Sequence, residues 1–170
     1  VAGTRFINCN YGQGIKDQKK ETIHFVSYFH RDFEQKTGLS VPLTLPYGDI
    51  HLSPHERAIN PITGRYWVML SGGKTDFTIK VWNSASFQAV VCQLRDRGIQ
   101  VVQLGDNQRT HWHPTIQGTL DLRGKTSLRN MLQIIQHADG VICGVTAAMH
   151  MAAAMQRPCV VIAGGREAWW

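Results

Sequence analysis

Residues 124–165 read GKTSLRNMLQIIQHADGVICGVTAAMHMAAAMQRPCVVIAGG, and this stretch decides the fold of the chain. Ser127 is a typical N-cap, and the residues after it predict a helix whose buried face is formed by Leu128, Met131, Leu132 and Ile135. The run GVIC then predicts a buried strand, and residues 147–156 predict a buried helix that is apolar nearly all round. PCVVIAG predicts another strand that starts with its proline. This order of elements is typical of a parallel sheet with right-handed crossovers.

The same alternation of strands and helices extends toward the amino terminus. Residues 66–71 (YWVMLS) and 99–106 (IQVVQLGD) predict strands, and a shorter strand is expected at 118–122. Residues 84–97 predict an amphipathic helix with an apolar face formed by Phe87, Val90, Val91 and Leu94. We therefore predict an α/β fold, a Rossmann-like parallel sheet with helices on both faces. Ligands bind such sheets at the carboxyl ends of the strands, so the loops of interest are 71–80, 104–110, 123–127 and 144–150.

The first 64 residues lack this alternation. Residues 1–20 are polar and glycine-containing, which is typical of a loop, whereas residues 21–36 carry apolar side chains at helical spacing before Gly38. Residues 40–65 contain four prolines and no periodicity, so we interpret them as a linker. The predicted organisation is a loop, helix and interdomain linker over 1–64 and a Rossmann-like domain over 65–170. We expect that the chain is cut from a longer protein at both ends.

Charge and cysteine content exclude several kinds of site. Eighteen Lys and Arg face twelve Asp and Glu, giving a net charge of +6, but the basic residues are scattered. Scattered charge suits anionic small molecules, and without an arginine–aromatic cluster we expect no nucleic acid partner. The four cysteines are far apart with no CxxC pair, and the pairs His111/His113 and His51/His55 have no third ligand nearby. We therefore expect no metal site.

From the sequence we expect no signal peptide and no membrane span. Its first residues do not form a basic segment followed by an apolar run. The longest uncharged stretch, 140–156, is shorter than the ~20 apolar residues that a span requires. We therefore expect a cytoplasmic protein, and the basic balance also suits peripheral contact with the inner face of a membrane.

The turn at 144–150 is the first candidate ligand site. A helix that begins there exposes unpaired amides, equivalent to roughly half a positive charge, which favours an anion such as phosphate. Thr146 and the amide of Ala147 lie at the start of this helix, and His150 follows one turn later on the same face. The alternative is purely structural, with Thr146 as a helix cap and His150 as a hydrogen-bonded core residue.

The loop SGGKTDFTIK at 71–80 is the second candidate. Small residues after a strand let backbone amides approach an anion, and Thr75, Thr78 or Lys80 could bind phosphate oxygens. GKT occurs here, but the first glycine that a Walker A motif requires is missing, so this is not a P-loop. The alternative is an ordinary solvated turn.

From residue 21 to its end, the chain resembles the C-terminal half of glycosyltransferase family 9, the ADP-heptose:lipopolysaccharide heptosyltransferases and their relatives. A Leu-Ser-Pro-x-Glu-Arg phrase (LSPHERA), a small-residue loop ending Lys-x-Trp, a helix ending Arg-Gly, the strand IQVVQLGD and a GKTSL phrase occur in the family's order. A helix ending Ala-Asp, a strand and the family's Asp-Thr-Gly-x-x-His-x-x-Ala-Ala pattern, at 145–154, come last, before a strand that begins with proline.

The resemblance implies a GT-B fold of two Rossmann-like domains, of which this chain carries the C-terminal, donor-binding one. It implies that Thr75 and Lys80 contact the donor phosphates and that Thr146 and the amide of Ala147 face the diphosphate, with His150 beside them. It also implies a ribose contact by Asp106 and a base pocket lined by Lys125, Thr126 and Leu128.

The resemblance further implies an activity for the intact parent protein. The parent would transfer a sugar from a nucleotide donor, ADP-heptose or a similar one, to a glycan or lipid-linked acceptor of the lipopolysaccharide type. The displacement would be inverting and metal-independent, with no cofactor. The catalytic base would lie in the missing N-terminal domain, so this piece alone would bind the donor and transfer poorly.

The chain departs from the family pattern at two positions of the 144–150 turn. Val145 replaces the aspartate expected to help hold the sugar, and Ala147 replaces a glycine. Two alternatives therefore remain: a non-catalytic module for nucleotide-sugar binding or assembly, and a GT-B relative such as a nucleotide-sugar epimerase. An epimerase requires acidic residues in the cleft, for which Asp76 and Asp106 are the candidates.

Overall fold

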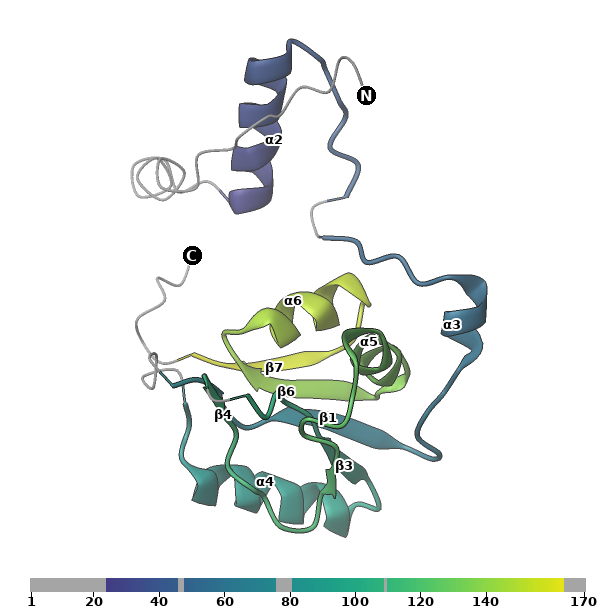
Figure 1. Ribbon diagram of the computed structural model, residues 1–170, viewed down its shortest axis with the longest axis vertical. Helices are drawn as coiled ribbons and strands as arrows, with labels where there is room; N and C mark the ends of the chain where they lie inside the picture. The colour runs from purple at the N-terminus through teal and green to yellow at the C-terminus, as the bar shows by residue number, and fades with distance from the viewer. Residues whose placement is uncertain (1–23, 46–47, 76–80, 109, 164–170) are drawn as a thin grey trace. The chain divides into compact units, whose positions relative to one another are not determined.

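The structure, a computed structural model, describes residues 24–45, 48–75, 81–108 and 110–163 (Figure 1). The chain forms two compact units, with the boundary between Gly48 and Asp49. The second unit is built around a five-stranded sheet in the order β5-β3-β1-β6-β7. Every neighbouring pair in this sheet is parallel, as the sequence predicts. The strands are β1 (Tyr66–Leu70), β3 (Gln100–Gln103), β5 (Leu120–Asp121), β6 (Gly140–Gly144) and β7 (Cys159–Ile162).

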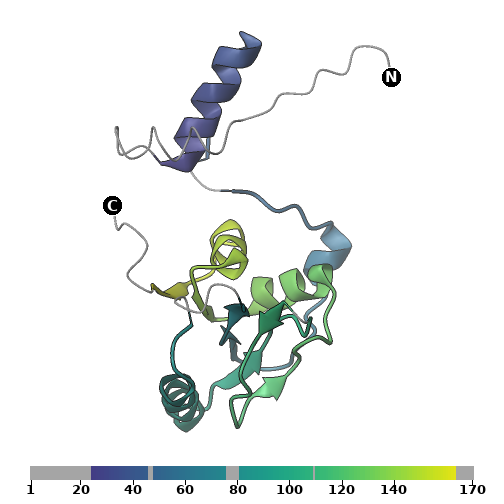
Figure 2. The ribbon, with the colours of Figure 1, turned by 60° about the vertical axis from the view of Figure 1, so that its left-hand side comes forward.

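Helices cover both faces of this sheet (Figure 1; Figure 2). α5 (Leu128–His137) and α6 (Ala147–Ala154) pack on the face that carries Tyr66, Val68 and Leu70 of β1. α4 (Ser84–Asp96) covers the opposite face, on which its buried side chains contact those of the central strands; the cluster contains Met69, Phe87, Val91, Val101 and Ile142. The period-two alternation of side chains along each strand explains this division. The predicted Rossmann-like fold with helices on both faces is confirmed.

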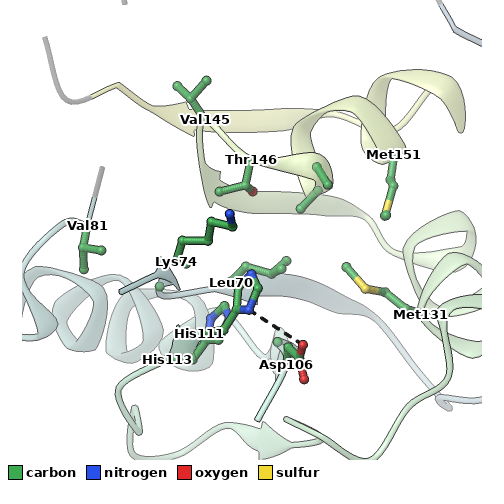
Figure 3. A pocket seen from close by; sticks show the side chains of 15 residues that line it. Leu70, Lys74, Val81, Asp106, His111, His113, Met131, Val145, Thr146 and Met151 are labelled. Carbon is green, nitrogen blue, oxygen red and sulfur yellow. Dashed lines mark ion pairs between the residues drawn. The ribbon is translucent and has the colours of Figure 1, made fainter. Parts of the chain in front are cut away.

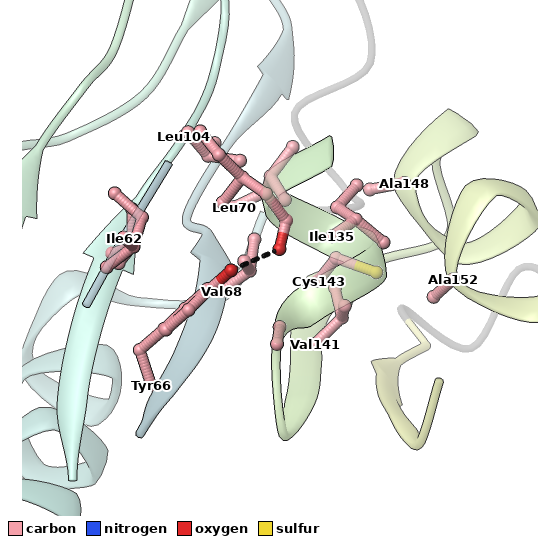
Figure 4. Close-up of a cluster of buried hydrophobic side chains, with 13 residues drawn as sticks. Ile62, Tyr66, Val68, Leu70, Leu104, Ile135, Val141, Cys143, Ala148 and Ala152 are labelled. Atoms are coloured by element: carbon pink, nitrogen blue, oxygen red, sulfur yellow. Dashed lines mark hydrogen bonds between the residues drawn. The ribbon is translucent and has the colours of Figure 1, made fainter. Parts of the chain in front are cut away.

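The α5 face of the sheet also buries one phenol. The Tyr66 hydroxyl donates a hydrogen bond of 2.8 Å to the carbonyl of Ile134 in α5 (Figure 4). Burial raises the pKa of Tyr66 to about 12, so this hydroxyl remains a donor over the physiological range. The bond ties the start of the central strand to α5 while the surrounding apolar residues exclude water.

The buried face of α5 differs from the predicted one. Leu128 is 61% exposed, although we expected it in the core. The buried residues of the helix are Leu132, Gln133, Ile134 and Ile135. Gln133 is covered because a short helix, α3 (Pro54–Ala58), packs on this side of α5. The side-chain amide of Gln133 donates a 3.3 Å bond to the carbonyl of Glu56. Leu128 lies at the first position after the Ser127 cap and stays in solvent.

The helix α3 lies within the region interpreted as a linker, so that interpretation is wrong for these residues. Ser53 is the N-cap, and it exchanges hydrogen bonds with Glu56 in a complete capping box, with Pro54 at the first helical position. These bonds stabilise the helix without any hydrophobic periodicity. α3 belongs to the compact unit that begins at Asp49, whereas we predicted that the domain begins at residue 65.

An ion pair fixes α3 to α5. The Arg129 guanidinium donates from Nε to Oε1 and from Nη2 to Oε2 of Glu56, both at 2.6 Å. Arg129 also donates a 3.1 Å bond to the carbonyl of His51. Two-pronged pairs of this kind are geometrically specific and stronger than single hydrogen bonds. The Glu-Arg phrase of the sequence therefore contributes its glutamate to a contact between two helices.

We expect acid to destabilise the protein at this contact. Hydrogen bonds from Arg129, and then from Ser53, lower the pKa of Glu56 from 4.5 to about 2. Because the folded-state pKa is lowered, the stabilisation is present above pH 4.5 and is lost as the pH falls toward 2. The melting temperature, followed by circular dichroism, should fall in this window. The melting temperature of Glu56→Gln should be lower at neutral pH and should fall less steeply as the pH drops. An equal fall of the melting temperature with pH in both proteins would contradict the assignment. Some slope remains in the variant because Arg123 also lowers the pKa of Asp121 to about 2.

The first unit contains α2 (Phe25–Thr37), which is close to the predicted helix over 21–36. Gly38, with a φ of 70°, ends it in the left-handed conformation that favours glycine. The segment that follows carries four exposed apolar side chains, those of Leu39, Val41, Leu43 and Leu45. Within the described part of the chain, no helix is long and apolar enough to cross a membrane.

Candidate functional site

A cavity of about 580 Å³ lies at the carboxyl edge of the parallel sheet, where the fold predicts a ligand (Figure 3). Loops that follow β1, β3 and β6 form it together with α5 and α6. Its apolar lining consists of Leu70, Val81, Met131, Val145, Ala147, Ala148 and Met151. Its polar side chains are Lys74, Asp106, His111, His113 and Thr146. An apolar cavity with a few convergent polar groups is the usual form of a small-molecule site.

Thr146 lies at the start of α6 and points into this cavity (Figure 3). Although Thr146 is the N-cap residue, its side chain makes no cap hydrogen bond. Its Oγ1 is buried and makes no hydrogen bond of ordinary length and angle among the described residues; the Cys143 thiol, only a weak acceptor, lies within interaction range. The first amides of α6, beginning at Ala147, also have no partner within the helix. The alternative in which Thr146 serves only as a cap is therefore wrong, and its hydroxyl remains available to a ligand.

His150 is not brought to the cavity. It belongs to the exposed side of α6, and the residue that follows it, Met151, faces the cavity instead. His150 follows Thr146 by one helical turn, as the spacing predicts. Its side chain does not line the cavity that Thr146 lines. Its exposure also excludes the alternative of a core histidine. A contact between His150 and the donor stays a prediction.

A two-stranded antiparallel ribbon forms one side of the cavity. It pairs β2 (Gly73–Lys74) with β4 (His111–Trp112), placing Lys74 opposite His111 and Gly73 opposite Trp112. We expected loops at both places, because runs of two residues show no periodicity. Gly72, which precedes β2, lies so close to β4 that a Cβ atom there would be 1.9 Å from the carbonyl oxygen of Trp112. Gly72 is therefore required by backbone packing.

Asp106 and His111 approach each other at the mouth of the cavity. The carboxylate Oδ2 lies 3.8 Å from Nδ1 of His111, and the Thr110 hydroxyl lies 3.2 Å from the same nitrogen (Figure 3). Asp106 also accepts a 3.1 Å bond from the amide of Gln108 through Oδ1. The sequence predicted Asp106 as a ribose contact, and the structure places it in the cavity lining.

His113 forms the floor of the cavity next to β3. Its ring lies against Gly105, where a Cβ atom would be only 2.7 Å away. Burial, followed by the positive charges of His111 and Arg123, lowers the pKa of His113, so its ring is neutral at physiological pH. Its Nδ1 is buried and has no hydrogen-bond partner in the described part of the chain. This nitrogen is a second polar atom in the site that lacks a protein partner.

The buried side chain of Gln103 holds the chain that follows β4 in place. Gln103 of β3 donates from Nε2 to Ser71 Oγ at 2.7 Å and to the Pro114 carbonyl at 2.6 Å. Its Oε1 accepts from the amide of Ile116 at 3.2 Å and from the Thr119 hydroxyl at 3.3 Å. Gln103 is completely buried. It therefore replaces the backbone partners that a regular strand would have offered to this segment.

Arg123 adds a clamp from the side of β5. Its guanidinium binds Asp121 at 2.7 Å and the Thr115 hydroxyl at 2.8 Å, and it also donates to the His113 carbonyl. Hydrogen bonding to Asp121 raises the pKa of Arg123, so it is charged at all relevant pH values. The position of His113 thus depends on β3 and β5 together.

The remaining predicted residues lie outside the cavity lining. Lys125 donates a 3.0 Å bond to the Asp121 carbonyl, and Leu128 is exposed. Thr126 is half-buried, and none of the three lines the cavity. Thr75 binds the Thr110 carbonyl through its amide at 3.0 Å, next to the cavity rather than in it. Lys80, Asp76 and Thr78 lie outside the described residues.

Sequence reasoning did not select three polar cavity residues, namely Lys74, His111 and His113. Lys74 belongs to the GGKT part of a loop in which the sequence predicts phosphate contacts by Thr75, Thr78 or Lys80 instead, and the spacing of HWH argues only against a metal site. The alternation in HWH was a usable signal, since it places both histidines on one side of an extended segment. Among the described residues, no group of three His, Cys, Asp or Glu could hold a metal ion.

Comparison with protein families identifies one match. The model described as glycosyltransferase family 9 (heptosyltransferase) matches residues 4–165, which is most of the chain. A search of curated protein sequences finds no match.

Three solved structures illustrate the likeness in fold. An E. coli heptosyltransferase WaaC with ADP-2-deoxy-2-fluoro heptose has 21% identity and a TM-score of 0.64, over 88% of this chain and 48% of that one. A family 9 glycosyl transferase from Veillonella parvula has 15% identity and a TM-score of 0.66, over 87% and 46%. E. coli ADP-heptose lps heptosyltransferase II has 21% identity and a TM-score of 0.58, over 71% and 41%. The chain thus spans less than half the length of each structure, and likenesses at these identities concern the fold alone.

Proposed function

Since the chain belongs to glycosyltransferase family 9 (heptosyltransferase), we propose that its cavity binds the diphosphate of a nucleotide-sugar donor. One observation carries the proposal: the buried hydroxyl of Thr146, at the amino end of α6, makes no hydrogen bond of ordinary geometry among the described residues and has only the weakly accepting Cys143 thiol within interaction range. A phosphate oxygen would accept from this hydroxyl and from the amides that begin at Ala147. The positive end of the helix favours the same negative charge.

This arrangement suits the chemistry of sugar transfer. When the bond between the anomeric carbon and the donor phosphate breaks, the bonding electrons leave with the nucleoside diphosphate. Fixed donors aimed at the phosphate stabilise this developing charge without reorganisation, which is the effect that a divalent cation provides elsewhere. We propose a metal-independent, inverting displacement. The acceptor would be a glycan or a lipopolysaccharide-type molecule, and the rest of the parent protein would bind it and supply the base.

ADP is the first nucleotide to test, because two of the similar structures are described with ADP-heptose or its fluoro analogue. Whether the sugar of the donor adds to the binding affinity has to be tested separately. Val145 lines the cavity beside Thr146, and its isopropyl side chain accepts no hydrogen bond from a sugar hydroxyl. Comparing ADP with ADP-heptose would therefore show how much affinity the sugar adds in this chain.

The test is calorimetric binding of ADP, UDP, GDP and CDP to the chain and to Thr146→Val. We expect one diphosphate to bind with a micromolar Kd and Thr146→Val to weaken it at least about tenfold, or about 1.4 kcal/mol. The variant keeps the shape of the side chain and removes only its hydroxyl. Thr63→Val is the matched control, because Thr63 is exposed in the loop before β1. Equal affinity in Thr146→Val would contradict the site, and a folded chain that binds no diphosphate would favour a non-catalytic assembly module.

A further inference from the structure

We propose that Lys74 and His111 form the second half of the phosphate site, with Lys74 as its cation, on the ribbon opposite Thr146 and the amino end of α6. The inference rests on the proposed function and adds two side chains to it. Neither residue was selected by sequence pattern, and each comes from a different crossover loop of the sheet.

The register of the ribbon places the two side chains on the same face. Lys74 and His111 are direct partners in the antiparallel pair, and directly opposite residues of such a pair project to the same side. Both line the cavity. Trp112, the next residue of β4, is 53% exposed and does not line the cavity. The ribbon therefore presents its basic face to the ligand and its aromatic residue to solvent.

The ribbon also lies close to the start of α6. A Cβ atom at Gly73 would be 3.9 Å from the methyl group of Thr146, which is ordinary contact distance. In Figure 3 the amine end of Lys74 points toward Thr146 across the cavity. A phosphate bound between them would accept from the hydroxyl and the helix amides on one side and from the ammonium group on the other.

The charges around the ribbon support this division of roles. A diphosphate carries more negative charge than the half charge of a helix terminus can offset, so a cationic side chain adds what α6 lacks. Within the described residues, no carboxylate pairs with Lys74. His111 faces Asp106, His113 and Lys74, with Arg123 behind His113. Asp106 Oδ2 lies 3.8 Å from Nδ1 of His111 and forms no ion pair with Lys74 within the described residues.

The test measures binding of ADP, inorganic pyrophosphate and adenosine to Lys74→Met, Lys74→Arg and the unchanged chain. Lys74→Met should weaken ADP and pyrophosphate about tenfold or more and leave adenosine unchanged, because only the phosphate contacts are lost. Lys74→Arg should recover most of the affinity. Arg97→Met is the matched charge control, since Arg97 is exposed at the end of α4, and it should bind like the unchanged chain.

His111→Gln removes the imidazole from the ligand side of the ribbon. It should therefore weaken ADP and pyrophosphate and leave adenosine unchanged, whereas a merely structural role would weaken all three alike. Its effect should be smaller than that of Lys74→Met, which removes a full charge. Unchanged pyrophosphate affinity in Lys74→Met, with binding lost in Thr146→Val, would overturn this inference and leave the proposed function intact. Loss of adenosine binding in Lys74→Met would also overturn it, and absence of ADP binding to the unchanged chain would refute both.

Discussion

Replacing Gln103 with methionine is expected to lower the free energy of unfolding by about 3 kcal/mol. Methionine fits the same volume but removes four hydrogen bonds at a site with no exposed surface. The amide of Ile116 then has no partner in a buried position, and an unsatisfied buried donor costs about 1–3 kcal/mol by itself. The Pro114 carbonyl keeps the 3.0 Å bond from Ser71, which limits the damage on that side.

Urea denaturation would measure this loss, with Gln100→Met as the matched control. Gln100 begins the same strand but is exposed, so its replacement should change stability little. Because Gln103 anchors the chain that follows β4, Gln103→Met should also weaken ADP. Equal stability of the two variants would mean that the segment after β4 is held by other contacts, Arg123 foremost.

The second large effect is expected at Gly72. In Gly72→Ala the new Cβ atom would meet three backbone atoms of Trp112 and His113, the nearest of them 1.9 Å away. Backbone cannot yield by a rotamer change, so the two strands of the ribbon must separate, and Lys74 and His111 move with them. We expect a loss of about 2 kcal/mol in unfolding free energy and about tenfold weaker binding of ADP.

Gly73→Ala is the control for this prediction. Its added Cβ atom would have only Thr146 nearby, at 3.9 Å, so the fold should tolerate it. Denaturation midpoints and ADP titrations of the two alanine variants form the comparison. Full stability of Gly72→Ala would contradict the close approach of the two strands in solution.

The sequence was sufficient for the parallel sheet and its helices because burial on both faces imposes periodicity. Apolar runs at 66–70 and 140–143 and the spacing of Phe87 and Val91 all follow from which side chains the core excludes from water. The family resemblance selected Thr146 and Ala147, and both line the cavity, while their contact with a donor stays a prediction. The sheet and these two residues were each found from local patterns.

The elements that were missed depend on partners distant in the sequence. The ribbon pairs residues 73–74 with 111–112, and the sequence of neither dipeptide indicates that it pairs with the other. The helix α3 is held by a capping box and by Arg129 of α5, so hydrophobic spacing could not reveal it. Leu128 was assigned to the core by periodicity, but burial begins only later in α5, where sheet and α3 meet it.

The clamp between Glu56 and Arg129 has a practical consequence for anyone who wishes to shorten this chain. A fragment that starts with the first strand, at Tyr66, would leave the Arg129 guanidinium without its carboxylate and would uncover the polar side of α5. A fragment that starts at Asp49 keeps both. The amino-terminal boundary of the shortest folded fragment is therefore set by the ion pair between Glu56 and Arg129, and it lies before the first strand of the sheet.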